Sequence, residues 1–461
     1  MSTQLLSQVA TVVGGKLLGA DAAFTRINTD TRTLVAGELF VAIVGEHFDA
    51  HDFVSAAEQH GAAGAVVQRQ VEGCALPQIV VPDTRKALGA YAHHWRMQFR
   101  IPVIGVTGSS GKTTLKEMLA RVLRVKGPVL ATRGNMNNDI GVPLTLLQLT
   151  SDHQAAVIEM GTNHPGEIAW LADIVAPSVG VITNAGAAHL EFLGSIEGVA
   201  KEKGALFAAL DETGVAVINA DDAYATTWQK MTRAGTRYTF GFGERAMFHP
   251  VPGSLQVNPD GAWQFRATSL SGDADVKLSL PGKHNIANAL AALAVATAVG
   301  VPLTEAAQAL ADVSGTAGRL FTMAGINDCR LIDDTYNANP LSLAAAVEFA
   351  VSLGKPVWLV LGDMGELGAS AEALHAEAGQ YARRAGVAHL MTLGNLSRAA
   401  SDSFGVAGEH FDDVETLIET LRHELPQGTT LLIKGSRSMR MERVVDALRA
   451  PQAAETAAQG S

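Results

Sequence analysis

The residues best suited to chemistry lie in one glycine-rich segment, Gly-Ser-Ser-Gly-Lys-Thr-Thr at residues 108–114. A loop of small residues lets several backbone N–H groups converge on phosphate oxygens, and a helix that follows adds the partial positive charge of its N-terminus. Lys112 would reach the outer phosphates, and the hydroxyl of Thr113 would bind the Mg²⁺ ion that accompanies the nucleotide. The segment therefore predicts a protein that binds a nucleoside triphosphate.

The stretches on either side of this loop have the composition that a phosphate-binding loop needs. Residues 101–106 form an apolar run rich in β-branched residues, which is typical of a strand buried on both faces. From Leu115 onward, apolar residues recur at helical spacing. The long form of the motif has a glycine where this chain has Val106, so a plain glycine-serine turn between a strand and a helix is the alternative.

Two further candidate residues follow apolar runs that predict buried strands. Glu159 ends the run at 155–158, and His189 comes shortly after the run at 179–183. Open α/β sheets bind ligands beyond the carboxyl ends of their strands. Glu159 is therefore a candidate magnesium ligand, with a surface carboxylate as the alternative, whereas His189 taken alone would be an ordinary loop histidine.

Other polar residues carry weaker signals. Lys203 lies in a predicted helix and by itself indicates only a solvated side chain. Asn285 and Asn288 put two amides on one helix face, which suits an adenine edge or a capping role equally well. Polar clusters also follow three predicted strands of the last third, and they favour either a pocket for a small zwitterion or simple loop polarity. These clusters lie at residues 333–339, 362–366 and 434–437.

The length of 461 residues and the order of the predicted elements indicate an α/β protein of three domains. A small N-terminal α/β domain would span 1–98, and a central doubly wound sheet of the phosphate-loop ATPase type would span 99–314. Alternating residues between 236 and 281, with the turn signal Pro-Asp-Gly at 259–261, predict a small β insertion in the central domain. A second α/β pattern predicts the last domain, 315–461.

Composition excludes several classes of function. The formal net charge of −11 argues against a nucleic-acid partner held by a broad basic surface. Two cysteines are too few for a disulfide framework or a cysteine zinc site. The N-terminus lacks a basic leader followed by a clean apolar run, and no apolar stretch is long enough for membrane insertion. The expectation is a soluble, cytoplasmic protein.

A series of short motifs runs along the chain in a fixed order. They are Asp-Thr-Arg at 30–32, Phe-Asp-Ala-His-Asp-Phe at 48–53, Thr-Gly-Ser-Ser-Gly-Lys-Thr at 107–113, Asn-Asn-Asp-Ile-Gly-Val-Pro at 137–143, Asn-His-Pro-Gly-Glu-Ile at 163–168, Gly-Lys-His-Asn-Ile-Ala-Asn at 282–288, Tyr-Asn-Ala-Asn-Pro at 336–340, Gly-Asp-Met-Gly-Glu-Leu-Gly at 362–368 and Lys-Gly-Ser-Arg-Ser at 434–438. With these motifs the chain resembles the Mur ligases of peptidoglycan synthesis over nearly its whole length. The loop with Val106 is similar to the form found in that family.

The resemblance implies an activity and its partners. A member of the dipeptide-adding branch joins D-alanyl-D-alanine to UDP-N-acetylmuramoyl-tripeptide, in the service of cell wall biogenesis, cell shape and cell division. ATP would phosphorylate the free carboxylate of the tripeptide, the amine of the dipeptide would attack the acyl phosphate, and a tetrahedral intermediate would expel phosphate. The resemblance also implies an N-terminal domain for the UDP-sugar, a central ATPase and a Rossmann-like C-terminal domain. We expect a monomer.

Residue by residue, the resemblance implies a nucleotide and metal site. Lys112 would meet the β- and γ-phosphates, Thr113 and Glu159 would hold one Mg²⁺ ion, and Glu159 and His189 would hold a second. Lys203 is similar to the family lysine that forms a carbamate with carbon dioxide and bridges the metals, with Lys201 as the competing choice. The residues implied to bind the nucleotide through the loop are Thr107, Gly108, Ser109, Ser110, Gly111, Lys112, Thr113 and Thr114.

The resemblance also implies contacts to the rest of the nucleotide. Asn285 and Asn288 would lie near the adenine, and Arg319 would meet the γ-phosphate from the C-terminal domain. Asp334 would bind the ribose, unless Asp333 takes that role.

Three other functions remain as alternatives. A sister ligase that adds a single amino acid and a folate polyglutamate ligase share the implied architecture, although the stretches at 336–340 and 362–368 resemble the dipeptide-adding branch more closely. A phosphate-loop switch that remodels a partner is an alternative of another class. The chain has no guanine-reading Asn-Lys-x-Asp motif, and three substrate-sized domains favour a metabolic ligase.

Overall fold

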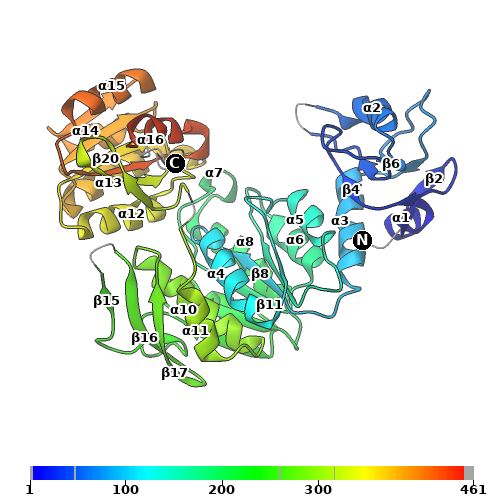
Figure 1. Ribbon diagram of the computed structural model, residues 1–461, viewed down its shortest axis with the longest axis horizontal. Coiled ribbons are helices and arrows are strands. Elements are labelled where there is room, and N and C mark those ends of the chain that lie inside the picture. The colour runs from blue at the N-terminus through cyan, green and yellow to red at the C-terminus, as the bar shows by residue number, and fades with distance from the viewer. Residues whose placement is uncertain (1–3, 46–47, 259–260, 316, 451–461) are drawn as a thin grey trace, which may run out of the picture.

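The computed structural model describes residues 4–45, 48–258, 261–315 and 317–450. It has three α/β lobes, each built around its own sheet (Figure 1). The N-terminal lobe, in blue, and the C-terminal lobe, in yellow to red, lie on either side of a central lobe in cyan and green. The predicted fold class, a three-domain α/β protein with a central doubly wound sheet, is confirmed.

The N-terminal lobe contains a five-stranded sheet with the order β2-β7-β6-β5-β4. Its helix α3 (Thr84–Arg96) is capped by Asp83, whose carboxylate accepts hydrogen bonds from the backbone N–H groups of Arg85 and Lys86. Buried residues of α3, among them Tyr91 and Trp95, belong to an apolar cluster that continues into the central lobe. The lobe consists of β1 (Gln4–Leu5), α1 (Leu6–Val13), β2 (Lys16–Leu18), β3 (Ala23–Phe24), β4 (Ile27–Asn28), β5 (Leu39–Val41), α2 (Val54–Gln59), β6 (Gly64–Val67), β7 (Gln78–Val80) and α3.

The central lobe contains a six-stranded sheet with the order β13-β12-β11-β8-β10-β9, and all its pairs are parallel. The apolar runs at 155–158 and 179–183, which predicted buried strands, lie in this sheet as β10 and β11. Because β8 has neighbours on both sides and helices on both faces, every one of its residues is buried. The strands are β8 (Val103–Thr107), β9 (Val129–Ala131), β10 (Ala155–Glu159), β11 (Val179–Ile182), β12 (Val215–Asn219) and β13 (Thr236–Phe240).

Two groups of helices cover this sheet. One apolar cluster packs α4, α10 and α11 on one face, and another packs α5, α6 and α8 on the other. The helices are α4 (Lys112–Leu123), α5 (Gly141–Leu146), α6 (Glu167–Val175), α7 (Leu190–Leu193), α8 (Ile196–Ala208), α9 (Ala225–Met231), α10 (His284–Ala298) and α11 (Leu303–Leu310).

The predicted β insertion is present but begins later than expected. Residues 236–240 form β13, which pairs in parallel with β12 and is an edge strand of the central sheet. The expected start of the insertion at 236 was therefore wrong. The insertion proper is a small antiparallel sheet. Pro259 and Asp260 of the predicted turn lie outside the described residues. The strands are β14 (His249–Pro250), β15 (Gln256–Val257), β16 (Trp263–Ser269) and β17 (Gly272–Leu278).

The C-terminal lobe contains a six-stranded sheet with the order β18-β19-β23-β20-β21-β22, parallel except for the edge strand β18. The sequence did not predict β18 or β22, because both are edge strands whose residues are largely exposed or only half-buried. The elements are β18 (Phe321–Ala324), β19 (Arg330–Asp334), α12 (Pro340–Ser352), β20 (Val357–Gly362), α13 (Ala371–Ala385), β21 (His389–Leu393), α14 (Arg398–Phe404), β22 (Gly408–Phe411), α15 (Val414–Glu424), β23 (Thr430–Lys434) and α16 (Glu442–Leu448).

Within the part of the chain that the structure describes, no helix combines the length and the apolar character that a membrane span requires.

Candidate active site

A cavity of about 890 Å³ opens at the carboxyl ends of the central strands, where parallel α/β sheets bind ligands. All three lobes contribute to its lining: Arg85 from the N-terminal lobe, Lys112 from the central lobe and Arg319 from the C-terminal side. The cavity is large enough for a nucleotide and part of a second substrate.

The glycines of the loop between β8 and α4 are required by their surroundings. Gly108 has φ 151°, and a Cβ atom there would lie 1.8 Å from the hydroxyl oxygen of Thr183. Gly111 has φ 81°, in the left-handed region, and a Cβ atom there would lie 3.1 Å from Oδ1 of Asn288. The loop therefore packs closely against Thr183, which follows β11, and against Asn288 of α10.

The segment after β11 holds the two serines of the loop. The backbone N–H of Ser109 donates to the carbonyl of Asn184, and that of Ser110 donates to its side-chain Oδ1, each over 3.0 Å. The hydroxyl of Ser109 accepts a hydrogen bond from the backbone N–H of Gly186. These contacts fix the loop before any ligand binds.

Lys112 begins α4 and bends back over the loop, where its Nζ donates to the carbonyl of Gly108 over 2.7 Å. Burial lowers the pKa of Lys112, and the positive charge of Arg319 lowers it further, whereas the carboxylate of Glu159 raises it. An anion bound in the loop would offset both unfavourable effects. The predicted contact between Lys112 and outer phosphates is consistent with this geometry.

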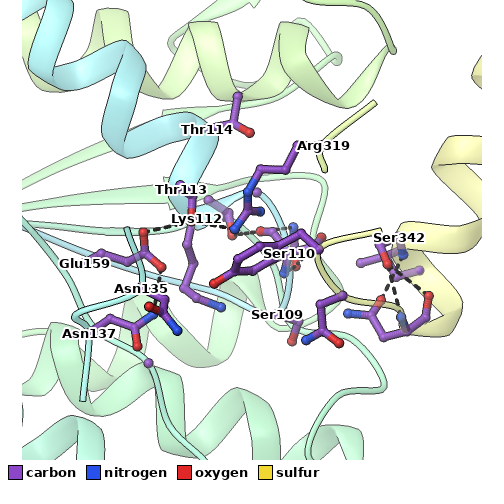
Figure 2. Close-up of a pocket in the computed structure, with 18 of the residues that line it drawn as sticks. Ser109, Ser110, Lys112, Thr113, Thr114, Asn135, Asn137, Glu159, Arg319 and Ser342 are labelled. Atoms are coloured by element: carbon purple, nitrogen blue, oxygen red, sulfur yellow. Dashed lines mark hydrogen bonds between the residues drawn. The ribbon is translucent and has the colours of Figure 1, made fainter. Parts of the chain in front are cut away.

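The hydroxyl of Thr113 forms hydrogen bonds with two other candidate site residues, Glu159 and Arg319. Its hydroxyl donates to Oε2 of Glu159 over 2.9 Å, and Nη2 of Arg319 donates to the same hydroxyl oxygen over 2.9 Å (Figure 2). The other oxygen of Glu159 accepts from Nδ2 of Asn137 over 2.8 Å, and the residue is 1% exposed. Arg319 thus reaches from the C-terminal side to the first turn of α4.

The donor set around Thr113 fits a magnesium ion. A hydroxyl and a buried carboxylate at the end of a phosphate loop are the compact oxygen ligands that Mg²⁺ prefers. Among the described residues, no group of three or more His, Cys, Asp or Glu side chains converges on one point.

Lys203 lies on α8 and is 1% exposed, whereas Lys201, two residues earlier on the same helix, is exposed. Burial lowers the pKa of Lys203 well below its usual range; the positive charge of Lys112 adds to this effect, and Glu202 opposes it. The structure therefore places an amine that loses its proton readily close to the phosphate loop. The sequence could not distinguish it from a solvated lysine.

His189 lines the cavity just before α7, as Glu159 does at the end of β10. Its ring Nδ1 contacts the carboxylate of Glu366 from the C-terminal lobe. The hydrogen bond from His189 lowers the pKa of Glu366. The two predicted metal ligands thus share a cavity, and the ring of one is held from the opposite lobe.

Asn285 and Asn288 line the cavity on α10, and their side chains bond to each other. Nδ2 of Asn288 donates to Oδ1 of Asn285 over 3.0 Å, and Nδ2 of Asn285 donates to the carbonyl of Pro281 over 2.7 Å. The N-cap residue of α10 is Lys283, and no side chain caps the helix, so the alternative capping role was wrong. The adenine contact stays a prediction.

The sequence offered both Asp333 and Asp334 for the ribose contact, and the structure gives the two side chains different surroundings. Asp334 lines the cavity, accepts from the backbone N–H of Leu320 and pairs with the buried Lys434. Asp333 accepts instead from the backbone of Gly318 over 2.9 Å and stabilises the local chain. Burial raises the pKa of Asp334, and the charge of Lys434 opposes that shift.

Three cavity residues were not assigned a role from the sequence. Asn137 orients Glu159, Glu366 contacts His189, and His284 lies at the start of α10. Burial and the charge of Lys434 lower the pKa of His284 to about 4. Asn137 and His284 stand inside motifs that carried the family resemblance, and Glu366 stands in a polar cluster, so only the fold could show what they contact.

The site has the features of a nucleotide-dependent enzyme whose active site lies between lobes. They are a phosphate loop, a buried carboxylate beside the threonine of that loop, and an arginine from a separate lobe. The chain matches the models of the Mur ligase family, catalytic domain, at residues 23–96, the Mur ligase middle domain at 106–296, and the Mur ligase, glutamate ligase domain, at 318–437. The chain belongs to the Mur ligase family. It is an ATP-dependent ligase that forms a peptide bond.

Similar proteins share one name. The chain is 44% identical to the UDP-N-acetylmuramoyl-tripeptide–D-alanyl-D-alanine ligase of Escherichia coli, over 97% of this chain and 99% of that protein. It is 40% identical to the ligase of the same name from Haemophilus influenzae, over 96% and 97%.

Solved structures agree with this similarity. A crystal structure of MurF from Acinetobacter baumannii is 34% identical, covers 97% of this chain and 98% of its own, and superimposes with a TM-score of 0.90. A structure of MurF ligase from Thermotoga maritima in complex with ADP is 28% identical, covers 92% and 96%, and has a TM-score of 0.83.

Proposed function

We propose that this chain joins D-alanyl-D-alanine to UDP-N-acetylmuramoyl-tripeptide with ATP, releasing ADP and phosphate and forming the UDP-muramoyl pentapeptide precursor of peptidoglycan. The observation that carries the proposal is the near full-length identity of 44% to a ligase named for these substrates. The cavity supports the proposal because residues of all three lobes line it, and a nucleotide, a UDP-linked peptide and a dipeptide must meet in one place.

The chemistry explains why ATP is needed. A carboxylate is a poor electrophile, and an amine that attacked it would have to expel an oxide ion, which is a poor leaving group. An acyl phosphate is a better electrophile, and its leaving group is phosphate. Transfer of the phosphoryl group develops charge on its oxygens, so catalysis depends on positioned positive charge. We assign Lys112 to the β- and γ-phosphates and Arg319 to the γ-phosphate, because both cationic groups lie at the first turn of α4.

We assign the remaining nucleotide contacts to the residues predicted for them. The loop from Gly108 to Thr114 would hold phosphate oxygens, mainly through the backbone N–H groups that follow Ser110, because those of Ser109 and Ser110 donate to Asn184. Asn285 and Asn288 would lie near the adenine. Asp334 is preferred over Asp333 for the ribose, because Asp334 lines the cavity and Asp333 is engaged with the backbone of Gly318.

Magnesium would be held by Thr113, Glu159 and His189. When bound, it screens the repulsion between the triphosphate and the substrate carboxylate. Thr113 and Glu159 already lie within 2.9 Å of each other, which supports a first ion at this place. A second ion near Glu159 and His189 is the finer part of the proposal.

We further propose a carbamate on Lys203. The neutral amine attacks the carbon of CO₂, an N–C bond forms, one C=O electron pair moves to oxygen, and the nitrogen loses a proton. The depressed pKa of Lys203 supplies the neutral amine, and the product is an anion beside the positively charged Lys112. Lys201, two residues earlier on the same helix, is exposed rather than buried.

The remaining predictions concern organisation. We propose domain boundaries at 1–98, 99–314 and 315–461, with the N-terminal domain binding the UDP-sugar. A monomeric state and a cytoplasmic location stay predictions, as do the absence of nucleic-acid and membrane partners.

Phosphate release measured with UDP-N-acetylmuramoyl-tripeptide, with and without D-alanyl-D-alanine, tests the proposed function. The expected result is release that requires both substrates and ATP, with the pentapeptide as product. Free D-alanine in place of the dipeptide controls for a ligase that adds a single amino acid. Release that ignores both substrates would instead support a phosphate-loop switch.

A further inference from the structure

His189 and Glu366 face each other across the junction between the central and C-terminal lobes. His189 immediately precedes α7, and Glu366 lies in the loop between β20 and α13. Nδ1 of the imidazole contacts Oε2 of the carboxylate. The side chain of His189 is 17% exposed and lines the cavity, and that of Glu366 is 43% exposed.

Both residues adopt a backbone conformation that is uncommon outside glycine. The φ angle is 56° at His189 and 61° at Glu366. Such conformations cost free energy and persist where the surrounding structure determines them, often at functional sites. Two of them on opposite sides of one contact indicate that the geometry of this contact is specifically maintained.

The main chain around Glu366 docks on α7 independently of the carboxylate. The backbone N–H of Glu191 donates to the carbonyl of Glu366 over 3.2 Å, and a Cβ atom at Gly368 would lie 3.0 Å from the Cα of Glu191. Removal of the Glu366 side chain therefore leaves the docking contacts of this loop in place.

An imidazole that binds a metal through one nitrogen usually donates the N–H of the other to a carboxylate or a carbonyl. That partner fixes the tautomer and the direction of the ring. In this protein the carboxylate meets Nδ1. This contact favours the tautomer with its proton on Nδ1, which leaves Nε2 as the nitrogen that can bind a metal.

We propose that Glu366 is a positioning residue that orients His189 toward the metal. Because Glu366 belongs to the C-terminal lobe, contact between the lobes completes a ligand that the central lobe cannot orient alone. The inference rests on the metal role proposed for His189. It adds a link between lobe docking and metal affinity.

Mn²⁺ serves as a probe that needs no turnover. The full-length chain is mixed with a non-hydrolysable ATP analogue, and bound Mn²⁺ is titrated by electron paramagnetic resonance. Loss of a carboxylate that orients a metal-binding histidine typically lowers metal affinity by about 10- to 100-fold. We expect Glu366→Ala to weaken the binding of the more weakly held ion by about tenfold, and Glu366→Gln to retain most of the affinity, because its amide oxygen still accepts from Nδ1.

A double variant separates positioning from a general role in stability. If Glu366 acts through His189, His189→Ala with Glu366→Ala should bind Mn²⁺ as His189→Ala alone does. Glu372→Ala, which removes an exposed carboxylate from the first turn of α13, is the matched control and should bind as the wild type does. Melting temperatures check that each variant is folded.

Two results would overturn the inference: wild-type Mn²⁺ affinity in Glu366→Ala, or an undiminished effect of Glu366→Ala when His189 is already alanine. Wild-type ligation is measured separately with the tripeptide and dipeptide substrates. Failure of that assay would count against the proposed function, while the Mn²⁺ comparison would still decide the role of Glu366.

Discussion

In the central lobe, the part of the cavity wall that contains the phosphate loop is one continuous segment of β8, the loop and α4, which we call the first wall. The C-terminal lobe supplies the second wall, and its residues are distant from one another in sequence. Asp334 and Lys434 are 100 positions apart in sequence and meet only because β19 and β23 are neighbours. The first wall presents a short loop and the side chains of Lys112 and Thr113, which follow it directly in sequence. The second presents charged side chains whose placement depends on a whole sheet, so the two walls should respond differently to substitution.

The largest effect is expected at the first wall. Lys112→Ala removes the cation closest to the transferring phosphate, and we expect ligation to fall by about 10³-fold, as for the loss of a key transition-state contact. The melting temperature should change little. Coupled phosphate release measures the rate, and Lys230→Ala, an exposed lysine on α9, is the control. Near-normal turnover of Lys112→Ala would refute the loop assignment.

Lys203→Ala tests whether a buried amine beside the first wall works as a carbamate. We expect a loss of about 10²- to 10³-fold, because an anionic group near the metals disappears. Small carboxylates added to the assay should restore part of the activity by taking the place of the carbamate. Lys201→Ala on the same helix should behave as wild type; equal behaviour of the two variants would show that Lys203 has no special role.

At the second wall, Arg319→Ala should lower kcat by about 10²-fold, since a charge-assisted contact with the transferring group is lost. The affinity for ADP, measured by calorimetry, should change much less, because Arg319 is proposed to meet the γ-phosphate that ADP lacks. Arg319→Lys keeps the charge but not the planar group that lies 4.0 Å over the ring of Tyr336, so it should recover only part of the rate. A loss of ADP affinity in Arg319→Ala as large as the loss in kcat would contradict the assignment of Arg319 to the γ-phosphate.

The smallest effect concerns pH. The pKa of His284 is lowered from 6.5 to about 4, so the folded protein binds this proton less tightly than the unfolded chain does. The stability contributed by the neutral ring is complete above about pH 6.5 and decreases as the pH falls toward 4. His284→Gln should therefore flatten the decline of the free energy of unfolding over this range, as followed by urea denaturation. The exposed His423→Gln should leave the decline unchanged.

Much of the first wall could be predicted from the sequence. The strand, the glycine loop and the helix are adjacent in the chain, so their composition and spacing reveal them directly, although the helix begins at Lys112 rather than Leu115. The position of Glu159 at the end of a buried strand was also predictable, because an apolar run that stops at a carboxylate marks the carboxyl edge of a sheet.

The second wall was less predictable from the pattern of residues. A polar cluster after β19 was visible, but which of Asp333 and Asp334 faces the cavity depends on the alternation of side chains along the strand and on the loop that returns to Gly318. The assignment of 236–240 to the insertion failed for a related reason. An alternating strand looks the same whether it pairs with the central sheet or with a separate one.

The sequence alone determined the α/β class, the phosphate loop and the family, because these depend on local periodicity, on glycines at fixed offsets and on motifs in a fixed order. Only the tertiary structure decided that Lys203 rather than Lys201 is buried near the loop, that Arg319 reaches Thr113, and that Glu366 meets His189. Burial and contacts between lobes arise from packing among segments far apart in the chain, and packing sets the pKa of a lysine or the orientation of a ring.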